Sequence, residues 1–212
     1  MNLYDVFAAC TFVRGYFRHR RLSRFRRIFR PAFCKTIIDV GGTPDIWSIL
    51  NYPSAVTLVN TERRQLEPSN GFMAVMGDGR RLPFSDDAFD LAFSNSVIEH
   101  VGNKRDMEQF AKELSRVGKG YYCQTPNRWF PIEPHLGTLF LHWFPQLINC
   151  YFVVRYLTLW GIMNRPTRAT AAESLSQIRL LGKGELKSLF PDSNIITERF
   201  MLLPKSYAAI RR

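Results

Sequence analysis

The sequence predicts an α/β fold built on an open, mainly parallel sheet, and three observations lead to this prediction. Short apolar runs rich in β-branched residues alternate with segments of helical periodicity. The first of these runs, residues 36–40, ends in a Gly-Gly turn followed by a helix start, which is the usual form of a strand-to-helix connection. No internal repeat interrupts the alternation, so we expect one sheet with helices on its faces.

The composition limits the class of protein. A length of 212 residues with 46% hydrophobic content allows one substantial core. Four widely spaced cysteines without a C-x-x-C pair argue against a zinc site or a disulfide framework and favour a reducing compartment. Arg14 and Arg18 interrupt any secretory signal core, and the most apolar stretch, residues 136–154, contains His142 and Pro145. We therefore expect neither a signal peptide nor a spanning helix, and no metal.

Residues 1–35 are predicted to form a basic amphipathic helical arm. This segment contains eight arginines and one lysine but a single acid, so most of the net charge of +11 lies in it. Apolar residues at helical spacing between Leu3 and Phe29 lie opposite the arginines. Such a helix suits an anionic membrane surface. A helix packed across the sheet edge and a nucleic-acid arm remain alternatives.

The remaining elements follow in chain order within a domain of residues 36–212. We expect strands at 36–40, 55–59, 72–76, 88–94 and 120–124, and helices at 45–50 and 104–117. An apolar insertion at about 125–176 breaks the pattern, with two predicted helical stretches at roughly 136–144 and 146–163. A helix at 183–190 and strands at 195–200 and 206–211 complete the domain. Because this insertion is so apolar, we expect it to cover a ligand cleft or to face lipid.

The turn after the first strand has the chemistry of a nucleotide site. Gly41 and Gly42 allow a ligand close to the backbone, and the helix start that follows presents unpaired N–H groups. The turn has no lysine, so it differs from a phosphate-binding P-loop. Asp39, at the end of the strand, suits a cationic or hydroxyl-bearing ligand instead.

Three motifs occur in a recognisable order. They are Asp39-Val40-Gly41, then Gly77-Asp78 with Leu82-Pro83-Phe84-Ser85-Asp86-Asp87-Ala88-Phe89-Asp90, then Glu99-His100-Val101. In these motifs the chain resembles the class I S-adenosylmethionine-dependent methyltransferases, over residues 36–124 and again over the tail from 178 to 211. The resemblance implies a Rossmann-like, seven-stranded, mainly parallel sheet with an antiparallel last strand, and S-adenosyl-L-methionine as cofactor.

The resemblance also implies which residues hold the cofactor. Asp39, Gly41 and Gly42 would take the methionine end, and Asn60 stands where the family has an acid for the ribose. The remaining positions are Asp78 and Gly79 for the adenine, and Ser94 and Asn95 beneath the cofactor. Thr43 and Asp45 replace glycines that are usual in the family. These departures leave open a non-catalytic protein that keeps the fold.

The candidate catalytic residues lie in the segment Pro131-Ile132-Glu133-Pro134-His135. An imidazole titrates near neutral pH, so histidine is suited to remove the proton of an acceptor hydroxyl or amine. The hypothesis is that His135 is the general base, oriented by Glu133, with Asn127 and Trp129 shaping the pocket. The alternative is that this segment is only a rigid connection. His100 would support the loop over the cofactor.

Together these features predict an S-adenosylmethionine-dependent methyltransferase that acts on a small or lipid-linked acceptor, with oxygen as the favoured atom. The insertion would cover the active site, and the arm would contact an anionic membrane from the cytoplasmic side. An RNA methyltransferase that uses the arginines for phosphates is the alternative enzyme, although the interleaved phenylalanines fit nucleic acid poorly. A dinucleotide-dependent reductase is disfavoured because the G-x-G-x-x-G fingerprint is absent.

Overall fold

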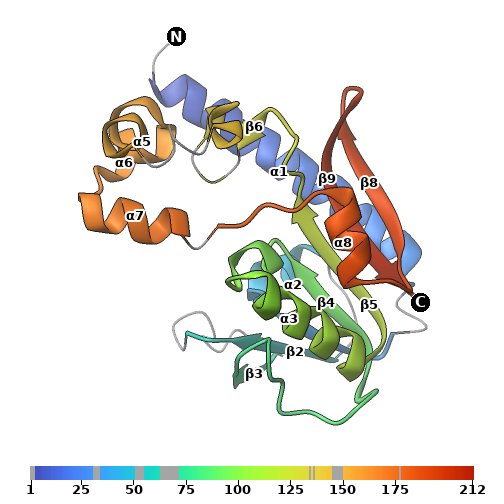
Figure 1. Ribbon diagram of the computed structural model, residues 1–212. Helices are drawn as coiled ribbons and strands as arrows, with labels where there is room; N and C mark the ends of the chain where they lie inside the picture. Colours follow the sequence, from blue (N-terminus) through green and yellow to red (C-terminus); the bar gives the residue numbers. More distant parts are fainter. Residues whose placement is uncertain are drawn as a thin grey trace.

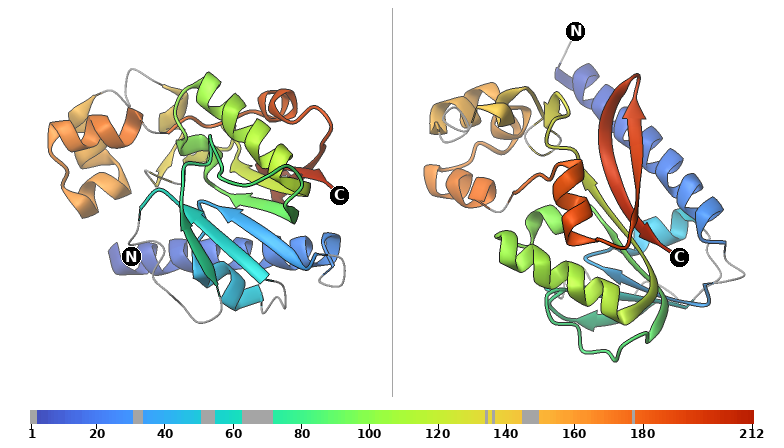
Figure 2. Two further views of the ribbon diagram at one scale, coloured as in Figure 1. Left: turned by 90° about the horizontal axis from the view of Figure 1, so that it is seen from below. Right: turned by 45° about the vertical axis from the view of Figure 1, so that its right-hand side comes forward.

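A computed structural model of the protein shows one seven-stranded sheet with helices on both faces and a helical insertion at one end (Figures 1 and 2). It describes residues 3–30, 34–50, 55–62, 72–133, 135, 137–144, 150–176 and 178–212, with the side chains of residues 3–14 left out. Residues 63–71, between the second and third predicted strands, lie outside the described residues.

The sheet has the strand order β3-β2-β1-β4-β5-β9-β8. Five strands are mutually parallel: β1 (Thr36–Val40), β2 (Ala55–Asn60), β3 (Met73–Met76), β4 (Phe89–Asn95) and β5 (Gly118–Pro126). The last strand, β9 (Leu203–Arg211), lies between β5 and β8 (Asn194–Phe200) and runs antiparallel to both. The predicted fold class is therefore confirmed, including the antiparallel last strand.

Helices cover both faces of this sheet, as the left view of Figure 2 shows. One face carries α3 (Lys104–Val117) and α8 (Lys183–Leu189), and the other carries α1 (Leu3–Ile28) and α2 (Pro44–Leu50). The start of α3 is fixed by a capping box, in which Asn103 accepts from the first turn and Asp106 accepts from the backbone of Asn103. Its buried residues follow helical spacing: Met107, Phe110, Ala111, Leu114 and Val117.

The second half of α1 packs on the sheet. Phe25 is fully buried, and its ring lies 4.9 Å from that of Phe93 and 5.3 Å from that of Tyr122. Phe17, Leu22 and Phe29 are also buried, while most arginines between them are exposed. From Phe17 onward the apolar face is therefore covered by protein, as the packed-helix alternative predicts. The side chains of the first half, which the membrane prediction also uses, lie outside the described residues.

The insertion differs from its prediction. The helix predicted at 136–144 is wrong, because β6 (Ile132–Glu133) and β7 (Thr138–Leu139) form a short hairpin followed by the 3-10 turn η3 (Leu141–Trp143). Gly137 and Phe140 have φ of +65° and +58°, a left-handed conformation that a right-handed helix cannot contain.

The second predicted helix is divided in two. Its described part forms α5 (Tyr151–Leu157) and α6 (Leu159–Asn164), which meet at Thr158. The Thr158 hydroxyl donates to the carbonyl of Val154 and accepts from the backbone N–H of Gly161, so it ends one helix and caps the next. A further helix, α7 (Arg168–Ser176), was not predicted, and it packs on α5 through Val154 and Ala171. None of the described helices is both long and apolar enough to cross a bilayer.

Candidate active site

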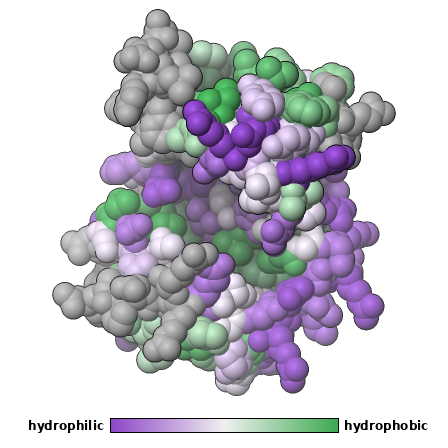
Figure 3. Space-filling model, turned by 90° about the vertical axis from the view of Figure 1, so that its left-hand side faces the viewer, coloured by the Kyte–Doolittle hydropathy of each residue, from purple (hydrophilic) through white to green (hydrophobic). Residues whose placement is uncertain are grey.

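The predicted cofactor residues gather at one edge of the sheet. Strands β1 to β4 are parallel, and the chain order reverses between β1 and β4, so the carboxyl ends of these strands border the crevice where open α/β sheets bind ligands. Asp39, Asn60 and Asn95 lie within the last two residues of β1, β2 and β4, and Asp78 follows β3 by two residues. Figure 3 looks onto this side of the molecule, where a recess lies between the insertion and the part that carries β2 and β3.

Asp39 is buried beneath the turn and has one unused oxygen. Its carboxylate has no exposed surface, and Trp47 of α2 donates from Nε1 to Oδ2 over 2.7 Å. Burial raises the pKa of this carboxyl to about 7, and the Trp47 hydrogen bond opposes the rise. Oδ1 has no hydrogen-bond partner. A buried acceptor without a partner is costly, so this atom fits the ammonium or hydroxyl group of a ligand.

The two glycines of the turn leave no room for a side chain. A Cβ on Gly42 would lie 1.8 Å from Asp39 Oδ2, and one on Gly41 would lie 2.6 Å from a methyl carbon of Val97. Gly41 also has a φ of +81°, which other residues rarely adopt. The turn is therefore wrapped around the Asp39 carboxylate, and both glycines are required by its shape.

Two of the predicted cofactor residues hold this turn in place. Asn60 donates from Nδ2 to the carbonyl oxygen of Gly42 over 3.0 Å, which leaves its side-chain oxygen as an acceptor for the ribose. Ser94 is fully buried and donates to the carbonyl oxygen of Val40 over 3.1 Å. The amide at position 60 therefore has a structural task that the family's carboxylate, which has no N–H, does not perform.

Asp78 lies in a different setting from Asp39. Its carboxylate is exposed and is held by Arg80, with an N–O distance of 2.6 Å in the ion pair. The Arg80 hydrogen bond holds the pKa of Asp78 below its usual range, so the group is ionised at neutral pH. Arg80 also pairs with Asp106 at 3.0 Å. Gly79 is packed closely, since a Cβ there would lie 2.5 Å from the Phe110 ring.

Asn95 connects the site to α1. Its Oδ1 accepts a hydrogen bond of 2.9 Å from Arg21, which also donates to Gln124 and forms an ion pair with Glu198. Helical spacing groups Arg21 with the other arginines of the arm and does not show which of them reaches the sheet. The contact of Trp47 with Asp39 was not predicted either. A tryptophan in the short helix that follows the first strand was an available signal for it.

The candidate catalytic residues are brought together on the insertion side. His135 Nδ1 lies 2.7 Å from Oε1 of Glu133, which is buried in the short hairpin. The His135 ring also meets the ring of His100 edge-on at 4.8 Å. Beside them Glu99 is fully buried and accepts from the Thr125 hydroxyl over 3.0 Å. Burial raises the pKa of the Glu99 carboxyl to about 7.

The predicted pocket-shaping residues have separate roles. Asn127 is buried and uses its amide locally, since Nδ2 donates to the carbonyl oxygen of Pro204 and Oδ1 accepts from the backbone N–H of Trp129. Trp129 is 61% exposed, with the guanidinium of Arg128 over its ring. Asn127 thus fixes the path of the chain after β5, while Trp129 presents an aromatic surface to solvent.

Known proteins share sequence or fold with this chain. The family model described as a methyltransferase domain matches residues 46–120. This part of the chain is similar to methyltransferase domains, and the fold supports the predicted class I family. A Pyrococcus horikoshii protein, PH0226, has a similar structure with a TM-score of 0.59 at 15% identity, over 92% of this chain and 89% of that one. A SAM-dependent methyltransferase of Archaeoglobus fulgidus gives 0.57 at 14% identity, over 91% and 93%.

Curated relatives match only a short part of the chain. Two uncharacterized proteins of Mycobacterium tuberculosis are 36% identical over 53 residues, which is 25% of this chain and 18% of theirs. The matched region therefore covers less than a fifth of the length of these relatives. For the methyltransferase domain, the family match and the similar structures support an S-adenosylmethionine-dependent methyltransferase with S-adenosylmethionine as cofactor.

Proposed function

We propose that this chain transfers the methyl group of S-adenosylmethionine to a hydroxyl group of a small or lipid-linked acceptor. The observation that carries the proposal is the buried Oδ1 of Asp39, which has no partner beneath a turn at the carboxyl edge of the sheet. Asp39, the Gly41-Gly42 turn and Asn60 would hold the methionine and ribose parts, with Asp78 at the adenine. When bound, the cofactor supplies an electrophilic methyl group on a sulfonium.

The acceptor side of the proposal rests on His135 and Glu133. Their 2.7 Å contact fixes the imidazole and leaves Nε2 available for the acceptor hydroxyl. His135 takes the hydroxyl proton while the acceptor oxygen bonds to the methyl carbon and the carbon–sulfur bond breaks. Glu133 keeps the ring oriented and stabilises its positive charge. Little else is required of the protein beyond alignment and exclusion of water.

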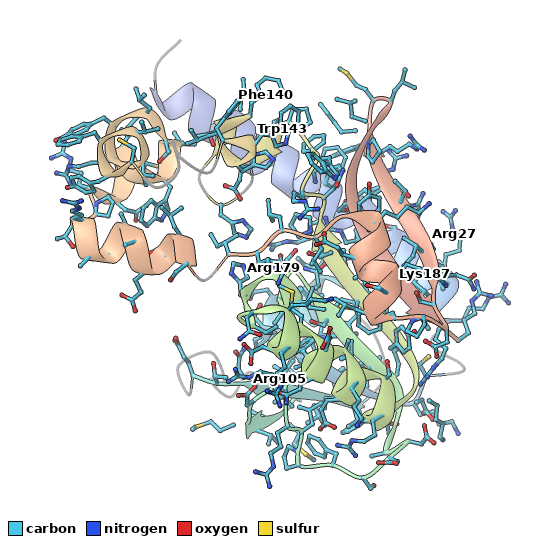
Figure 4. The ribbon with its side chains drawn as sticks, in the orientation of Figure 1. Arg27, Arg105, Phe140, Trp143, Arg179 and Lys187 are labelled. Atoms are coloured by element: carbon cyan, nitrogen blue, oxygen red, sulfur yellow. The ribbon has the colours of Figure 1, made fainter. Side chains whose placement is uncertain are left out.

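Exposed apolar side chains on the insertion support a lipid-linked acceptor. Figure 4 labels two of them, Phe140 and Trp143, whose rings lie 5.0 Å apart next to the β6–β7 hairpin. Others lie on α5, where Phe152 and Leu157 are 69% and 71% exposed. On the neighbouring face a cavity of about 500 Å³ is lined by Arg20, Arg21 and Arg24 together with residues of β8 and β9. Apolar and basic surfaces of this kind suit an anionic lipid surface, where we place the protein.

Two measurements test the proposal. Titration calorimetry with S-adenosylmethionine separates an enzyme from a non-catalytic protein that keeps the fold, because the latter gives no heat of binding. Incubation with methyl-labelled cofactor and a total lipid extract then tests the acceptor class, with label expected in the organic phase. A His135→Ala variant that binds the cofactor and keeps full turnover would contradict the role of His135.

The same incubation with RNA tests the alternative enzyme. We expect no label in RNA, since the apolar insertion offers little to phosphates. Label in RNA, together with RNA binding that falls steeply as salt is raised, would favour the RNA methyltransferase instead.

A further inference from the structure

Three potential metal ligands meet next to the acceptor side of the site. One ligand atom from each of Glu99, His100 and His135 can be chosen so that all three lie within 4.8 Å of one another. Glu99 and His100 come from the turn η2 (Ile98–His100) after β4, whereas His135 comes from the connection between β6 and β7. Glu99 is fully buried and His100 is exposed, so the cluster extends from the interior to the surface.

An unused buried oxygen points to a missing ligand in this cluster. Oε2 of Glu99 accepts from the Thr125 hydroxyl, but Oε1 has no hydrogen-bond partner. A buried carboxylate oxygen without a partner loses its hydration and gains nothing in return. A cation bound at Oε1 would supply the missing interaction.

The surroundings of His135 also favour a cation. Two buried carboxylates, Glu99 and Glu133, lie close to the same imidazole, and Arg21 is the nearby cation that acts on Glu99. His135 faces Glu133 through Nδ1, which leaves Nε2 as the ligand atom. A histidine that donates its second N–H to a carboxylate is the usual arrangement around protein-bound metals, because it fixes the ring and makes the ligand nitrogen more basic.

We infer that Glu99, His100 and His135 bind a divalent transition-metal ion of the zinc, manganese or iron(II) class. Two imidazoles and one carboxylate are a suitable donor set for these ions. Three protein ligands leave an open coordination position, which an acceptor oxygen can occupy. The sequence contains no C-x-x-C pair, so no metal was predicted from it. The three ligands proposed here approach one another only in the folded chain.

The ion would alter one step of the proposed function, on which this part of the inference rests. The two roles of His135 Nε2 are alternatives: in the metal-free chain it takes the acceptor proton, and in the metal-bound chain it is a ligand. A bound ion would lower the pKa of the coordinated acceptor hydroxyl, so that its proton would pass to solvent. The oxygen would then bond to the methyl carbon as the carbon–sulfur bond breaks. Metal binding itself does not depend on the methyl transfer.

The test is a titration of the full, chelator-treated chain with Co²⁺, which reports its coordination by visible absorption. We expect one equivalent to bind with the spectrum of nitrogen and oxygen ligands, and Zn²⁺ to displace it. His100→Ala and His135→Ala should weaken binding at least about 100-fold, and Glu133→Gln by roughly 10-fold to 100-fold. His19→Ala, on the exposed face of α1, is the matched control and should bind like the wild type.

Two results would overturn the inference. One is the absence of stoichiometric Co²⁺ binding to the wild type, and the other is binding that stays unchanged in both His100→Ala and His135→Ala. His100 is exposed, so His100→Ala is expected to fold normally, and its loss of metal binding would not reflect misfolding. A parallel titration of metal-free protein with S-adenosylmethionine shows whether the cofactor half of the site works, so failure of the metal site is distinguishable from failure of the proposed function.

Discussion

Asp39 illustrates at the scale of one residue how burial creates a ligand site. Its carboxyl pKa is raised from 3.8 to about 7 because the group is fully desolvated. Between these values the folded chain binds more protons than the unfolded chain, so this group makes the protein less stable as pH rises from about 4 to 7. A carboxylate kept at such a cost, with one oxygen unpaired, is better explained by a ligand than by the fold.

The first prediction concerns Asp39→Asn. Relative to the wild type, the variant should gain about 3 kcal/mol of stability between pH 4.5 and pH 8, because its neutral amide does not ionise while the wild-type carboxyl does. Urea unfolding at the two pH values measures the difference in stability between the variant and the wild type. A difference that does not change with pH would contradict a raised pKa of the Asp39 carboxyl. Cofactor binding should weaken in the same variant at pH 8, as seen by calorimetry, because the charge that meets the ligand's ammonium is lost.

The second prediction concerns the glycine next to the carboxylate. Gly42→Ala would place its Cβ 1.8 Å from Asp39 Oδ2, so the turn must open. We expect a loss of about 1–3 kcal/mol in the free energy of unfolding and at least a tenfold loss of cofactor affinity. Gly184→Ala in α8 is the control, because no atom lies within 4 Å of its added Cβ. Equal behaviour of the two variants would show that the turn does not depend on Gly42.

At the scale of elements, α1 is both a surface and part of the core. Its aromatic residues pack on the sheet, and Arg21 reaches the ends of β4 and β5 through Asn95 and Gln124. The arm is therefore joined to the site through its second half. The arginines that remain exposed are free of this packing and can meet an anionic surface.

The third prediction separates these two sides of α1. Phe25→Ala removes a fully buried ring that contacts Phe93 and Tyr122, and should cost about 3–5 kcal/mol of stability. Arg27, labelled in Figure 4, lies two residues further on the exposed face, and Arg27→Ala should change stability by less than about 0.5 kcal/mol. Denaturant unfolding measures both. A small effect of Phe25→Ala would mean that the helix is not part of the cooperative core.

At the scale of the whole molecule, the exposed apolar side chains lie mainly at the end that carries the insertion. Figure 1 places α5 and α6 at the end opposite β3. The turn between β8 and β9 adds Met201 and Leu202, both more than 80% exposed. We propose that the apolar end and the basic side chains along α1 together orient the molecule on an anionic membrane.

The fourth prediction follows from this orientation. Replacing Phe152 and Leu157 on α5 by serine should reduce co-flotation with anionic liposomes, because it removes apolar side chains that lipid would cover. Met73→Ser is the matched control, since Met73 is comparably exposed at 65% but lies on β3 at the other end. Flotation that is unaffected by the α5 changes, or absent in the wild type, would count against a membrane-bound acceptor.

The sequence by itself determined the sheet, most of its strands, α3 and the residues at the strand ends, because alternating periodicity and turn residues act over short distances along the chain. The helix predicted at 136–144 was wrong because left-handed residues and a small hairpin override apolar periodicity there. Only the tertiary structure decided that Trp47 holds Asp39, that Arg21 reaches Asn95, and that Glu99, His100 and His135 meet. The Arg21–Asn95 contact and the approach of His135 to Glu99 and His100 join distant segments, so they exist only once packing has brought the strand ends together. Trp47 lies only eight residues from Asp39, but its hydrogen bond depends on how α2 packs against β1.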